Sequence, residues 1–435
     1  MITDKMLSEM IGITSPWSIS QSKFDMKKKT LEIHVECASK YWVDDDGNRL
    51  TIHGYEERRW RHLNMFEFTT WITARIPRLK LANRKPNDDD EQQVDDSNDG
   101  AARETAAETG PKSKTMLMPV PWAEPYVRFT RNLELFIIEV LRACKTVKEA
   151  AGLLHLSWDE VDGVMQRAVK RGLMRRIEEP IEYLCIDEKS FGKGHSYATI
   201  VADSGRKRVL EVGDGRTTEK ASQTIVSCTS EKQRKGVKAI SMDMSPSFIA
   251  TAHGLLPNAD IVFDHFHVSK LLNEAVDKIR KETHKQNMLR GDDSLKGTKY
   301  DWLMNPDSMD ESRLAKFLKA FEANAVVGKA WTEKENFASF WECQNREEAG
   351  TFFETWYRRV KRRKGLAPMK KVAETLKKHL YGLLAYMDHR ISNGYAEGLN
   401  SLISILKTAA RGFRNKERFR TCVLFHHGKL DMLPA

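Results

Sequence analysis

The sequence predicts a multidomain α+β protein: a β-rich N-terminal module, a small helical domain, and a mixed α/β core with a helical insertion. Three observations carry this prediction. Before residue 86, several stretches alternate or are rich in β-branched and aromatic residues, as strands are. Residues 128–176 instead place apolar residues at helical spacing. From Ile181 onward, short apolar strands are followed by helical stretches, a pattern typical of a sheet covered by helices.

The composition is that of a globular protein. The chain has 435 residues, of which 40% are hydrophobic, enough for roughly two to four domains with real cores. No apolar run approaches the ~18 residues of a membrane helix, and the start MITDKMLSEMIG lacks a signal peptide's apolar stretch. The six cysteines are scattered without a CxxC pair, which argues against disulfides and a four-cysteine zinc site. We expect a cytoplasmic protein that does not engage a membrane.

The charge is positive and unevenly distributed. The formal net charge is +10, although Pro86 to Gly110 holds nine acidic residues and one basic residue. The excess on the rest of the chain suggests a polyanionic partner, while a basic surface kept for solubility is the alternative. Residues 86–114 contain almost no large apolar residue, so we predict a disordered acidic linker. A solvated spacer and an acidic arm that mimics DNA are both compatible with it.

The N-terminal module, residues 1–85, is predicted from the strand-like stretches LEIHVECAS and FEFTTWITARIPRLKL. Residues 115–178 follow the linker and are predicted to form a helix-turn-helix domain. Its last helix begins with a capping box, Ser157 with Glu160 three residues later, after the tight turn HLS. In a helix-turn-helix the second helix enters the major groove of DNA.

Polar and basic side chains on this last helix are candidate DNA contacts. Arg411 and Arg414, in the basic segment ARGFRNKER, are further candidates, and a competing interpretation makes the helix a packing or dimer element. On the helix and directly after it, the candidates are Gln166, Arg167, Lys170, Arg171, Arg175 and Arg176.

The first part of the core, residues 179–270, has the element order β-β-β-α-β-α-β-α, which is that of an RNase H-like fold. In that architecture the first and fourth strands are neighbours. Asp187 closes IEYLCIDE and Asp243 closes VKAISMDM, so we expect the two carboxylates to converge. Paired carboxylates can hold Mg²⁺, or Mn²⁺, for phosphodiester chemistry. A single aspartate at a strand end is commonplace, but this pair in this strand order is much more specific.

A third carboxylate is expected from the second part of the core, residues 389–435. Glu397 is the acid of RISNGYAEGLNSLISILKTAARGF, and Asn400 and Ser404 share its helix face. An acid favoured by the helix dipole is the alternative. Between Asp243 and Glu397 lie more residues than a bare core needs, so residues 271–388 are predicted to be an inserted helical domain. Its tryptophans are expected in its core rather than as wedges between bases.

These residues resemble a known family. CIDEKSFGKGHSYATIVAD, MDMSPSFIATA, DIVFDHFHVSKLLNEAVDKIR, SNGYAEGLNSLI and GFRNKERF look like the DDE transposases of bacterial insertion sequences, of the ISL-three type. The resemblance extends to RRWRHLNMFEF and LSWDEVDGVMQRAVKRGL, and covers about residues 30–435. It implies an enzyme that binds the terminal inverted repeats of an element, then cuts and joins double-stranded DNA at element ends and target with a divalent metal. A homodimer or higher oligomer on DNA, at the bacterial nucleoid, is expected.

The resemblance places the catalytic and metal-binding carboxylates on Asp187, Asp243 and Glu397. Asp264 in FDHFHV also matches a family motif and is a substitute candidate for Asp243. His265 and His267 are compatible with orienting a phosphate or a carboxylate, and equally with packing. Family members commonly carry an N-terminal zinc ribbon with a CxxC pair, whereas here Cys37 stands alone. We therefore expect a degenerate ribbon without zinc.

Two other functions remain open from the sequence. The first is a non-catalytic DNA-binding protein, either a domesticated relative or a repressor of the element; the presence of all three carboxylates argues against it. The second is an RNase H-like nuclease that cleaves without strand transfer. Strand-transfer products would distinguish a transposase from the nuclease.

Overall fold

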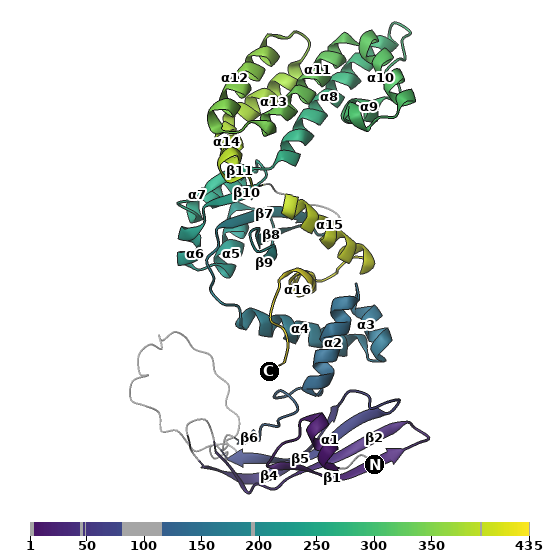
Figure 1. Ribbon diagram of the computed structural model, residues 1–435, viewed down its shortest axis with the longest axis vertical. Helices are drawn as coiled ribbons and strands as arrows, with labels where there is room; N and C mark the ends of the chain where they lie inside the picture. Colours follow the sequence, from purple (N-terminus) through teal and green to yellow (C-terminus); the bar gives the residue numbers. More distant parts are fainter. Residues whose placement is uncertain are drawn as a thin grey trace, which may run out of the picture. The chain divides into compact units, whose positions relative to one another are not determined.

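The computed structural model describes residues 4–43, 47, 49–80, 115–192, 196–391 and 394–434 (Figure 1). The chain divides into two compact units. The first runs to Ala168 and includes the last residues from Met432, and the second runs from Val169 to Asp431. The whole segment expected as an acidic linker, 86–114, lies outside the described residues, within the gap 81–114.

The first unit begins with helix α1 (Asp4–Ile11) and a six-stranded sheet. The sheet has the order β1-β2-β5-β4-β3, with β6 paired to β5. Among the described strands of this sheet, β2 and β5 are the only parallel pair. Side chains of β2 alternate between buried and half-exposed positions, so one face of the sheet covers the core. The strands are β1 (Trp17–Asp25), β2 (Thr30–Cys37), β3 (Tyr41–Val43), β4 (Arg49–Arg61), β5 (Thr69–Lys80) and β6 (Thr115–Leu117).

Three tryptophans from distant parts of the sequence meet in the core of this module. Trp17 and Trp60 each approach Trp122 edge-on, with ring centroids 5.1 and 5.6 Å away. All three side chains are at most 4% exposed. Edge-to-face aromatic packing adds to the free energy gained by burying such large side chains. The predicted β-rich module is therefore confirmed, and an apolar core holds it together.

The predicted helix-turn-helix consists of α2 (Arg131–Ala143), α3 (Val147–Leu154) and α4 (Trp158–Met174). The turn between α3 and α4 begins at His155, which has a left-handed backbone with φ 53°. The predicted capping box is present: the Glu160 carboxylate accepts from the Ser157 N–H at 2.8 Å, and the Ser157 hydroxyl accepts from the Glu160 N–H at 3.3 Å.

The second unit contains a five-stranded sheet of order β11-β10-β7-β8-β9. Strand β8 pairs antiparallel with both β7 and β9, and β10 lies between β7 and β11 and is parallel to both. This is the strand order predicted for an RNase H-like core. The strands are β7 (Tyr183–Ser190), β8 (Tyr197–Asp203), β9 (Arg208–Asp214), β10 (Ala239–Met242) and β11 (Asp260–Phe263).

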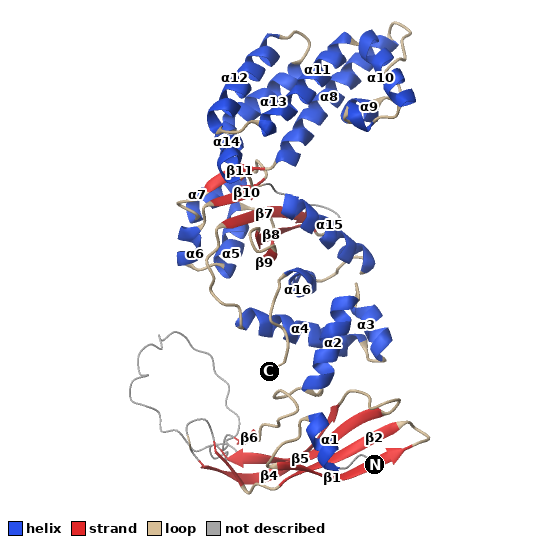
Figure 2. Cartoon of the chain, viewed as in Figure 1, coloured by secondary structure: helices blue, strands red, loops and turns tan. Residues whose placement is uncertain are grey.

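The connecting helices of this sheet also follow the prediction, with one difference. The stretch predicted as one helix after β9 is two, α5 (Thr218–Cys228) and α6 (Glu231–Gly236). Ser230 begins the second with a capping box of its own, which explains the break. Helix α7 (Pro246–Leu255) joins β10 to β11. Figure 2 shows these helices beside the strands of the sheet.

A helical region follows β11, as predicted, and opens with the 24-residue helix α8. Trp302 and Trp356 are fully buried in this region, which confirms that these tryptophans serve its core. The helices are α8 (His265–Met288), α9 (Lys299–Leu303), α10 (Glu311–Ala323), α11 (Ala325–Phe337), α12 (Arg346–Arg362), α13 (Ala367–Lys378) and α14 (Leu380–His389), with 3₁₀ turns at Pro306–Ser308 and Ala338–Glu342.

The last helix of this region returns to the sheet. Helix α14 packs against β11 at Gly382, where a Cβ atom would lie 2.4 Å from the ring of Phe263. A glycine is needed there because helix and strand approach so closely. The chain then continues into α15 (Gly394–Ala409) and α16 (Lys416–His427). Among the described residues, no helix is both long and apolar enough to cross a membrane.

Candidate active site

Three aspartates lie in register on three adjacent parallel strands. Ser241 of β10 pairs with Cys185 of β7, so Asp187 and Asp243 each lie two residues beyond one paired position. Met242 pairs with Phe263 of β11, and Asp243 and Asp264 each follow directly. Because residues at equal steps in a parallel ladder point the same way, the three carboxyl groups gather at one edge of the sheet. The predicted convergence of Asp187 and Asp243 follows from this register.

One detail differs from the sequence-based expectation. Strand β7 does not end at Asp187 and Glu188 but continues to Ser190, because β8 pairs with it up to Ser190. Asp187 therefore lies inside a strand, and its backbone is held on the side of β8. This position is more rigid than a strand end.

The predicted third carboxylate reaches the same place from α15. Glu397 is in the first turn of that helix. Its carboxyl group hydrogen-bonds that of Asp264, and the negative charge of Asp264 acts on it. The structure thus places all four acidic residues selected from the sequence around this edge of the sheet, with Glu397 beside Asp264 rather than Asp243.

Burial and the charges of neighbouring acids raise the pKa values of three carboxyl groups, those of Asp187, Asp243 and Glu397. Burial raises the pKa of Asp187 to about 6, and the charges of Asp243 and Asp264 add to the effect. Burial also raises the pKa of Asp243, with smaller contributions from Glu188 and Asp264. Burial and then the charge of Asp264 raise the pKa of Glu397. A cluster of buried carboxylates that disfavours its own ionisation is a site suited to a cation.

The structure gives more hydrogen bonds for the Asp264 carboxylate than for that of Asp243. One Asp264 oxygen accepts from the Phe266 N–H at 3.2 Å and caps α8. The other lies 2.8 Å from Nδ1 of His267, and this hydrogen bond raises the pKa of His267. For Asp243 the structure gives one hydrogen bond, from the Ser245 N–H at 3.0 Å. Asp264 therefore serves to fix the start of α8, which leaves Asp243 the better candidate ligand.

Two polar side chains, Asn400 and Lys189, connect α15 to β7. Nδ2 of Asn400 donates to Oδ2 of Asp187 at 2.5 Å. Nζ of Lys189 donates to the Asn400 carbonyl oxygen at 2.9 Å and to the Ser404 hydroxyl at 2.6 Å. The sequence had marked Asn400 and Ser404 only as sharing a face with Glu397. Sequence analysis did not select Lys189. Its position two residues after Asp187, on the same face of the strand, is the feature that could have pointed to it.

A divalent cation fits the chemistry of this site. Hard cations such as Mg²⁺ prefer carboxylate oxygens, and four carboxyl groups act on one another here. As they stand in the described parts of the chain, no three His, Cys, Asp or Glu side chains are gathered closely enough to hold a metal ion. Binding would therefore require the carboxyl groups to draw together, which the bound charge would favour.

The residues selected as DNA contacts on α4 fall into two groups. Gln166 and Lys170 are exposed, and the amide of Gln166 donates to Asp162 at 2.6 Å. Arg171 is half-exposed. Arg167 instead turns inward, and its guanidinium lies 3.3 Å from the carboxylate of the buried Glu134 on α2. Arg167 therefore holds the helix pair together, which the sequence did not indicate.

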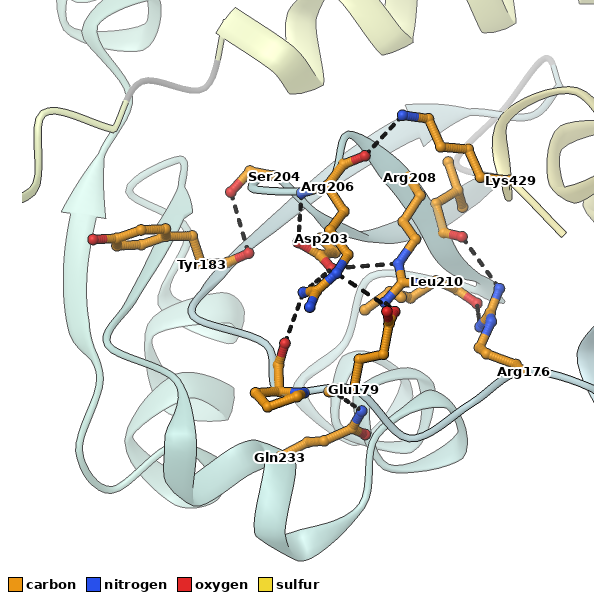
Figure 3. A network of polar contacts seen from close by, with 12 residues as sticks. Arg176, Glu179, Tyr183, Asp203, Ser204, Arg206, Arg208, Leu210, Gln233 and Lys429 are labelled. Atoms are coloured by element: carbon orange, nitrogen blue, oxygen red, sulfur yellow. Dashed lines mark hydrogen bonds and ion pairs between the residues drawn. The ribbon is translucent and has the colours of Figure 1, made fainter.

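The two arginines directly after α4 also make contacts within the protein. Arg176 donates to the carbonyl oxygens of Leu210 and Val209 on β9, at 2.8 and 3.4 Å (Figure 3). Arg175 lies 3.3 Å from the carboxylate of Asp431.

Figure 3 shows that Arg176 belongs to a larger polar network on this side of the sheet. Arg208 there pairs with the buried Asp203 and, at 2.8 Å, with Glu179. This network attaches the segment after α4 to β8 and β9. Of the basic residues selected near the chain end, Arg411 and Arg414 are both exposed.

Comparison with known families divides the chain in the same order. A profile described as the zinc-finger of transposase IS204/IS1001/IS1096/IS1165 matches residues 46–80. A profile described as the helix-turn-helix domain of transposase family ISL3 matches residues 118–169. A third, described as transposase, of the DDE ISL3 type, matches residues 184–423.

The residues of the zinc-finger match do not fit a zinc site. Residues 46–80 contain no cysteine, and their histidines are His53 and His62. His62 is buried, its Nδ1 lies 2.8 Å from the Thr130 hydroxyl, and burial lowers its pKa to about 4. Cys37, on β2, lies with its Sγ 3.7 Å from the sulfur of Met118. Zinc needs about four Cys or His ligands in a tetrahedron, and this module has a tryptophan core instead.

Whole-chain relatives agree with these matches. The transposase for insertion sequence element IS1001 of Bordetella parapertussis is 25% identical over 424 residues, which is 96% of each chain. The transposase for IS1557 of Mycobacterium tuberculosis (strain H37Rv) is 22% identical over 385 residues, 83% of this chain and 79% of the relative. With the DDE profile matching more than half of the residues, over the strands and helix that carry Asp187, Asp243 and Glu397, the chain belongs to the ISL3 family of DDE transposases of insertion sequences.

Proposed function

We propose that Asp187, Asp243 and Glu397 hold divalent metal, Mg²⁺ or Mn²⁺, and that the chain cuts DNA at the ends of its insertion element and joins them to a target. The observation that supports this proposal is the register that aligns Asp187 on β7 with Asp243 directly after the adjacent parallel strand β10. Helix α15 brings Glu397 beside Asp264, which occupies the equivalent position after β11. When bound, such ions stabilise the attacking and leaving oxygens of a phosphodiester displacement.

The reaction is two displacements at phosphorus. In the first, water attacks a phosphodiester at the element end, its proton goes to solvent, and the bond to the 3′ oxygen breaks to leave a 3′-OH. In the second, that 3′-OH attacks a target phosphodiester and displaces the target's own 3′ oxygen. Neither displacement needs an oxidant or a nucleotide cofactor.

The residues of this chain prepare the site for that chemistry. Asp187, with a pKa of about 6, carries a proton for part of the time near neutral pH and must release it to act as a ligand. The backbone N–H of Glu188 and the amide of Asn400 each donate to one of its oxygens and orient the carboxylate. Asp264 and His267 hold the start of α8 beside the site.

Recognition of the element's terminal inverted repeats is assigned to α4. The exposed Gln166 and Lys170 and the half-exposed Arg171 are the contacts supported by their positions. Arg411 and Arg414, exposed after α15, suit phosphate contacts. Because two element ends must be joined to one target, we infer a homodimer or higher oligomer on DNA. Its substrate places its action at the nucleoid, in the cytoplasm.

Substitution of single carboxylates tests this function. Asp187→Asn, Asp243→Asn and Glu397→Gln should each lower cleavage of end DNA by far more than tenfold and leave DNA binding intact. Strand-transfer products on a gel, with Mg²⁺ present, are the measurement. Glu282→Gln, an exposed acid on α8, is the control and should cleave normally.

Asp264→Asn distinguishes the two candidates for the second ligand. The amide oxygen can still cap α8, so we expect partial cleavage. An inactive Asp264→Asn beside an active Asp243→Asn would reverse the assignment. Full cleavage by Asp187→Asn would refute the site, and cleavage without any joined product would identify a nuclease instead of a transposase.

A further inference from the structure

Helix α15 is fastened to strand β7 by a row of polar contacts. On the helix, Asn400, Ser404 and Lys407 follow one another at a spacing of four and three residues, along one face. On the strand they meet Asp187, Lys189 and Ser190: Asn400 donates to Asp187, Lys189 donates to Asn400 and Ser404, and Lys407 donates to the Ser190 carbonyl oxygen at 2.9 Å. We call these contacts the α15–β7 clamp.

We propose that Asn400 is a positioning residue of the metal site, and that Lys189 with Ser404 holds it in place. This inference rests on the proposed role of Asp187, Asp243 and Glu397. It adds that affinity for the cation depends on a side chain that is neither an acid nor a ligand.

The first step of the argument is the orientation of Asp187. Its Oδ1 accepts from the Glu188 N–H at 2.7 Å and its Oδ2 from Asn400. Each carboxylate oxygen has two lone-pair directions, so one direction on each oxygen stays available for a cation. Groups that hydrogen-bond a ligand in this way commonly set metal affinity, because they fix the ligand before the metal arrives.

The second step is the orientation of Asn400 itself. Its Oδ1 is buried and has no hydrogen-bond partner among the described residues. Rotating the amide by half a turn would move this oxygen against the Asp187 carboxylate, where two acceptors repel. The amide N–H is therefore the group that faces Asp187. The hydrogen bond to Asp187 offsets the free-energy cost of burying the amide oxygen without a partner.

The third step is the position of Glu397. Glu397 is three residues before Asn400, so the two lie on one helix face one turn apart. Apolar packing holds α15 from one side only, since Leu402 and Ile405 are about half exposed. The clamp adds directional contacts to the buried apolar face of α15, so it helps to fix the helix along β7 and with it the distance of Glu397 from the aspartates.

Mn²⁺ binding by the full-length protein tests the proposal without relying on cleavage. Free Mn²⁺ is counted by electron paramagnetic resonance during a titration. Asn400→Leu keeps the branched shape of the side chain and removes the donor, so we expect Mn²⁺ binding at least tenfold weaker. End-DNA cleavage should then need a higher Mg²⁺ concentration and recover in part when Mg²⁺ is raised. Asn258→Ala, an asparagine that donates to the Lys235 carbonyl oxygen elsewhere in the same unit, is the control.

A second pair of variants separates the clamp from general damage to the helix. Ser404→Ala removes an acceptor of Lys189, whereas Ser401→Ala removes a hydroxyl that bonds only within α15, to the Glu397 carbonyl oxygen. We expect weaker Mn²⁺ binding for Ser404→Ala alone. Asn400→Gln retains an amide donor and should recover part of the affinity.

The outcomes separate this inference from the proposed function. If Asp187→Asn loses Mn²⁺ while Asn400→Leu, Ser404→Ala and Lys189→Met bind it as tightly as the natural chain, the clamp has no role and the inference is wrong. If Asp187→Asn itself binds Mn²⁺ normally, the carboxylate assignment fails and the clamp fails with it. A misfolded Asn400→Leu leaves the decision to Ser404→Ala against Ser401→Ala.

Discussion

Arg420 and Glu211 form a two-pronged ion pair. Nε of Arg420 lies 2.6 Å from Oε1 of Glu211, and Nη2 lies 2.7 Å from Oε2. Glu211 is on β9 and only 9% exposed, and Arg420 comes from α16. The pair fastens α16, the helix that follows α15, to the edge of the sheet, so α15 is held through the segment that follows it as well as by its contacts with β7.

We predict that removing the arginine of this pair destabilises the second unit. Arg420→Met leaves the Glu211 carboxylate buried without its main partner, which should cost about 3 kcal/mol in the free energy of unfolding. Arg420→Lys keeps the charge and loses the planar fork, so its cost should be smaller. Urea unfolding measures both. Lys232→Ala, an exposed lysine on α6, is the control. An unchanged free energy of unfolding in Arg420→Met would show that the ion pair makes no net contribution to stability.

The N-terminal module should be stable without zinc. Its apolar core around Trp122 supplies packing that needs no metal, and residues 46–80 contain no cysteine. Purified protein should hold less than one zinc per chain by elemental analysis, and a chelator should not change its unfolding. Trp122→Ala should cost about 3–5 kcal/mol, whereas Cys37→Ala should cost much less. A stoichiometric zinc that is lost together with the fold on chelation would contradict this prediction.

Acid should destabilise the first unit through His62. Burial lowers the pKa of this histidine to about 4, against 6.5 for a free histidine, so the folded chain holds it neutral. Above pH 6.5 both folded and unfolded chains are neutral there, and stability does not depend on it. Between pH 6.5 and 4 only the unfolded chain gains the proton. Stability then falls by about 1.4 kcal/mol per pH unit and levels off below pH 4.

His53 on β4 and His62, which directly follows that strand, form a matched pair that checks this pH dependence. His62→Gln should lower stability at neutral pH and make it less dependent on pH between 6.5 and 4. His53→Gln, at an exposed position of β4, should leave the dependence unchanged. Urea unfolding at pH 7 and pH 5 is the measurement. Other buried histidines add their own dependence, so the difference between the two variants decides. If the unfolding free energy of both variants depended equally on pH, the assignment of this pH dependence to His62 would be refuted.

Side chains on α4 should divide into those that read bases and those that hold phosphate. Gln166→Ala should reduce discrimination between end DNA and random DNA by about 1–3 kcal/mol if it makes a bidentate base contact. Lys170→Ala and Arg171→Ala should weaken binding to both DNAs alike and lower the salt slope by about one unit each. Titrations at several salt concentrations measure both effects.

Arg167 provides the contrast on the same helix. Because it pairs with the buried Glu134, Arg167→Ala should lower the free energy of unfolding rather than change the salt slope selectively. An unchanged affinity and slope in the Lys170→Ala, Arg171→Ala double variant would move recognition to Arg411 and Arg414 or to the basic strand β4.

The sequence by itself determined the elements and their order. Hydrophobic periodicity depends on neighbouring residues only, so it predicted the helices of the helix-turn-helix and the order of strands and helices in the core. The capping box followed from Ser157 and Glu160, and the pairing of β7 with β10 followed from the RNase H-like architecture that this element order matches. Local patterns also selected Asp187 and Asp243, which follow apolar stretches, and Glu397, the acid of its segment, while the family resemblance supplied their expected roles. The extra break between α5 and α6 was missed, since the cap at Ser230 is a weak local signal inside a helical stretch.

Only the tertiary structure decided what each polar residue touches. An arginine on a helix surface reads the same whether it meets DNA or a buried acid, and Glu134 is 33 residues away from Arg167 in the chain. Asn400 and Asp187 are 213 residues apart, so no local pattern could connect them. The partners of a long polar side chain are set by which elements pack together, and packing is a property of the whole fold. Composition and periodicity therefore specify the strands and helices, while pairing, burial and the resulting pKa shifts appear only when distant segments meet.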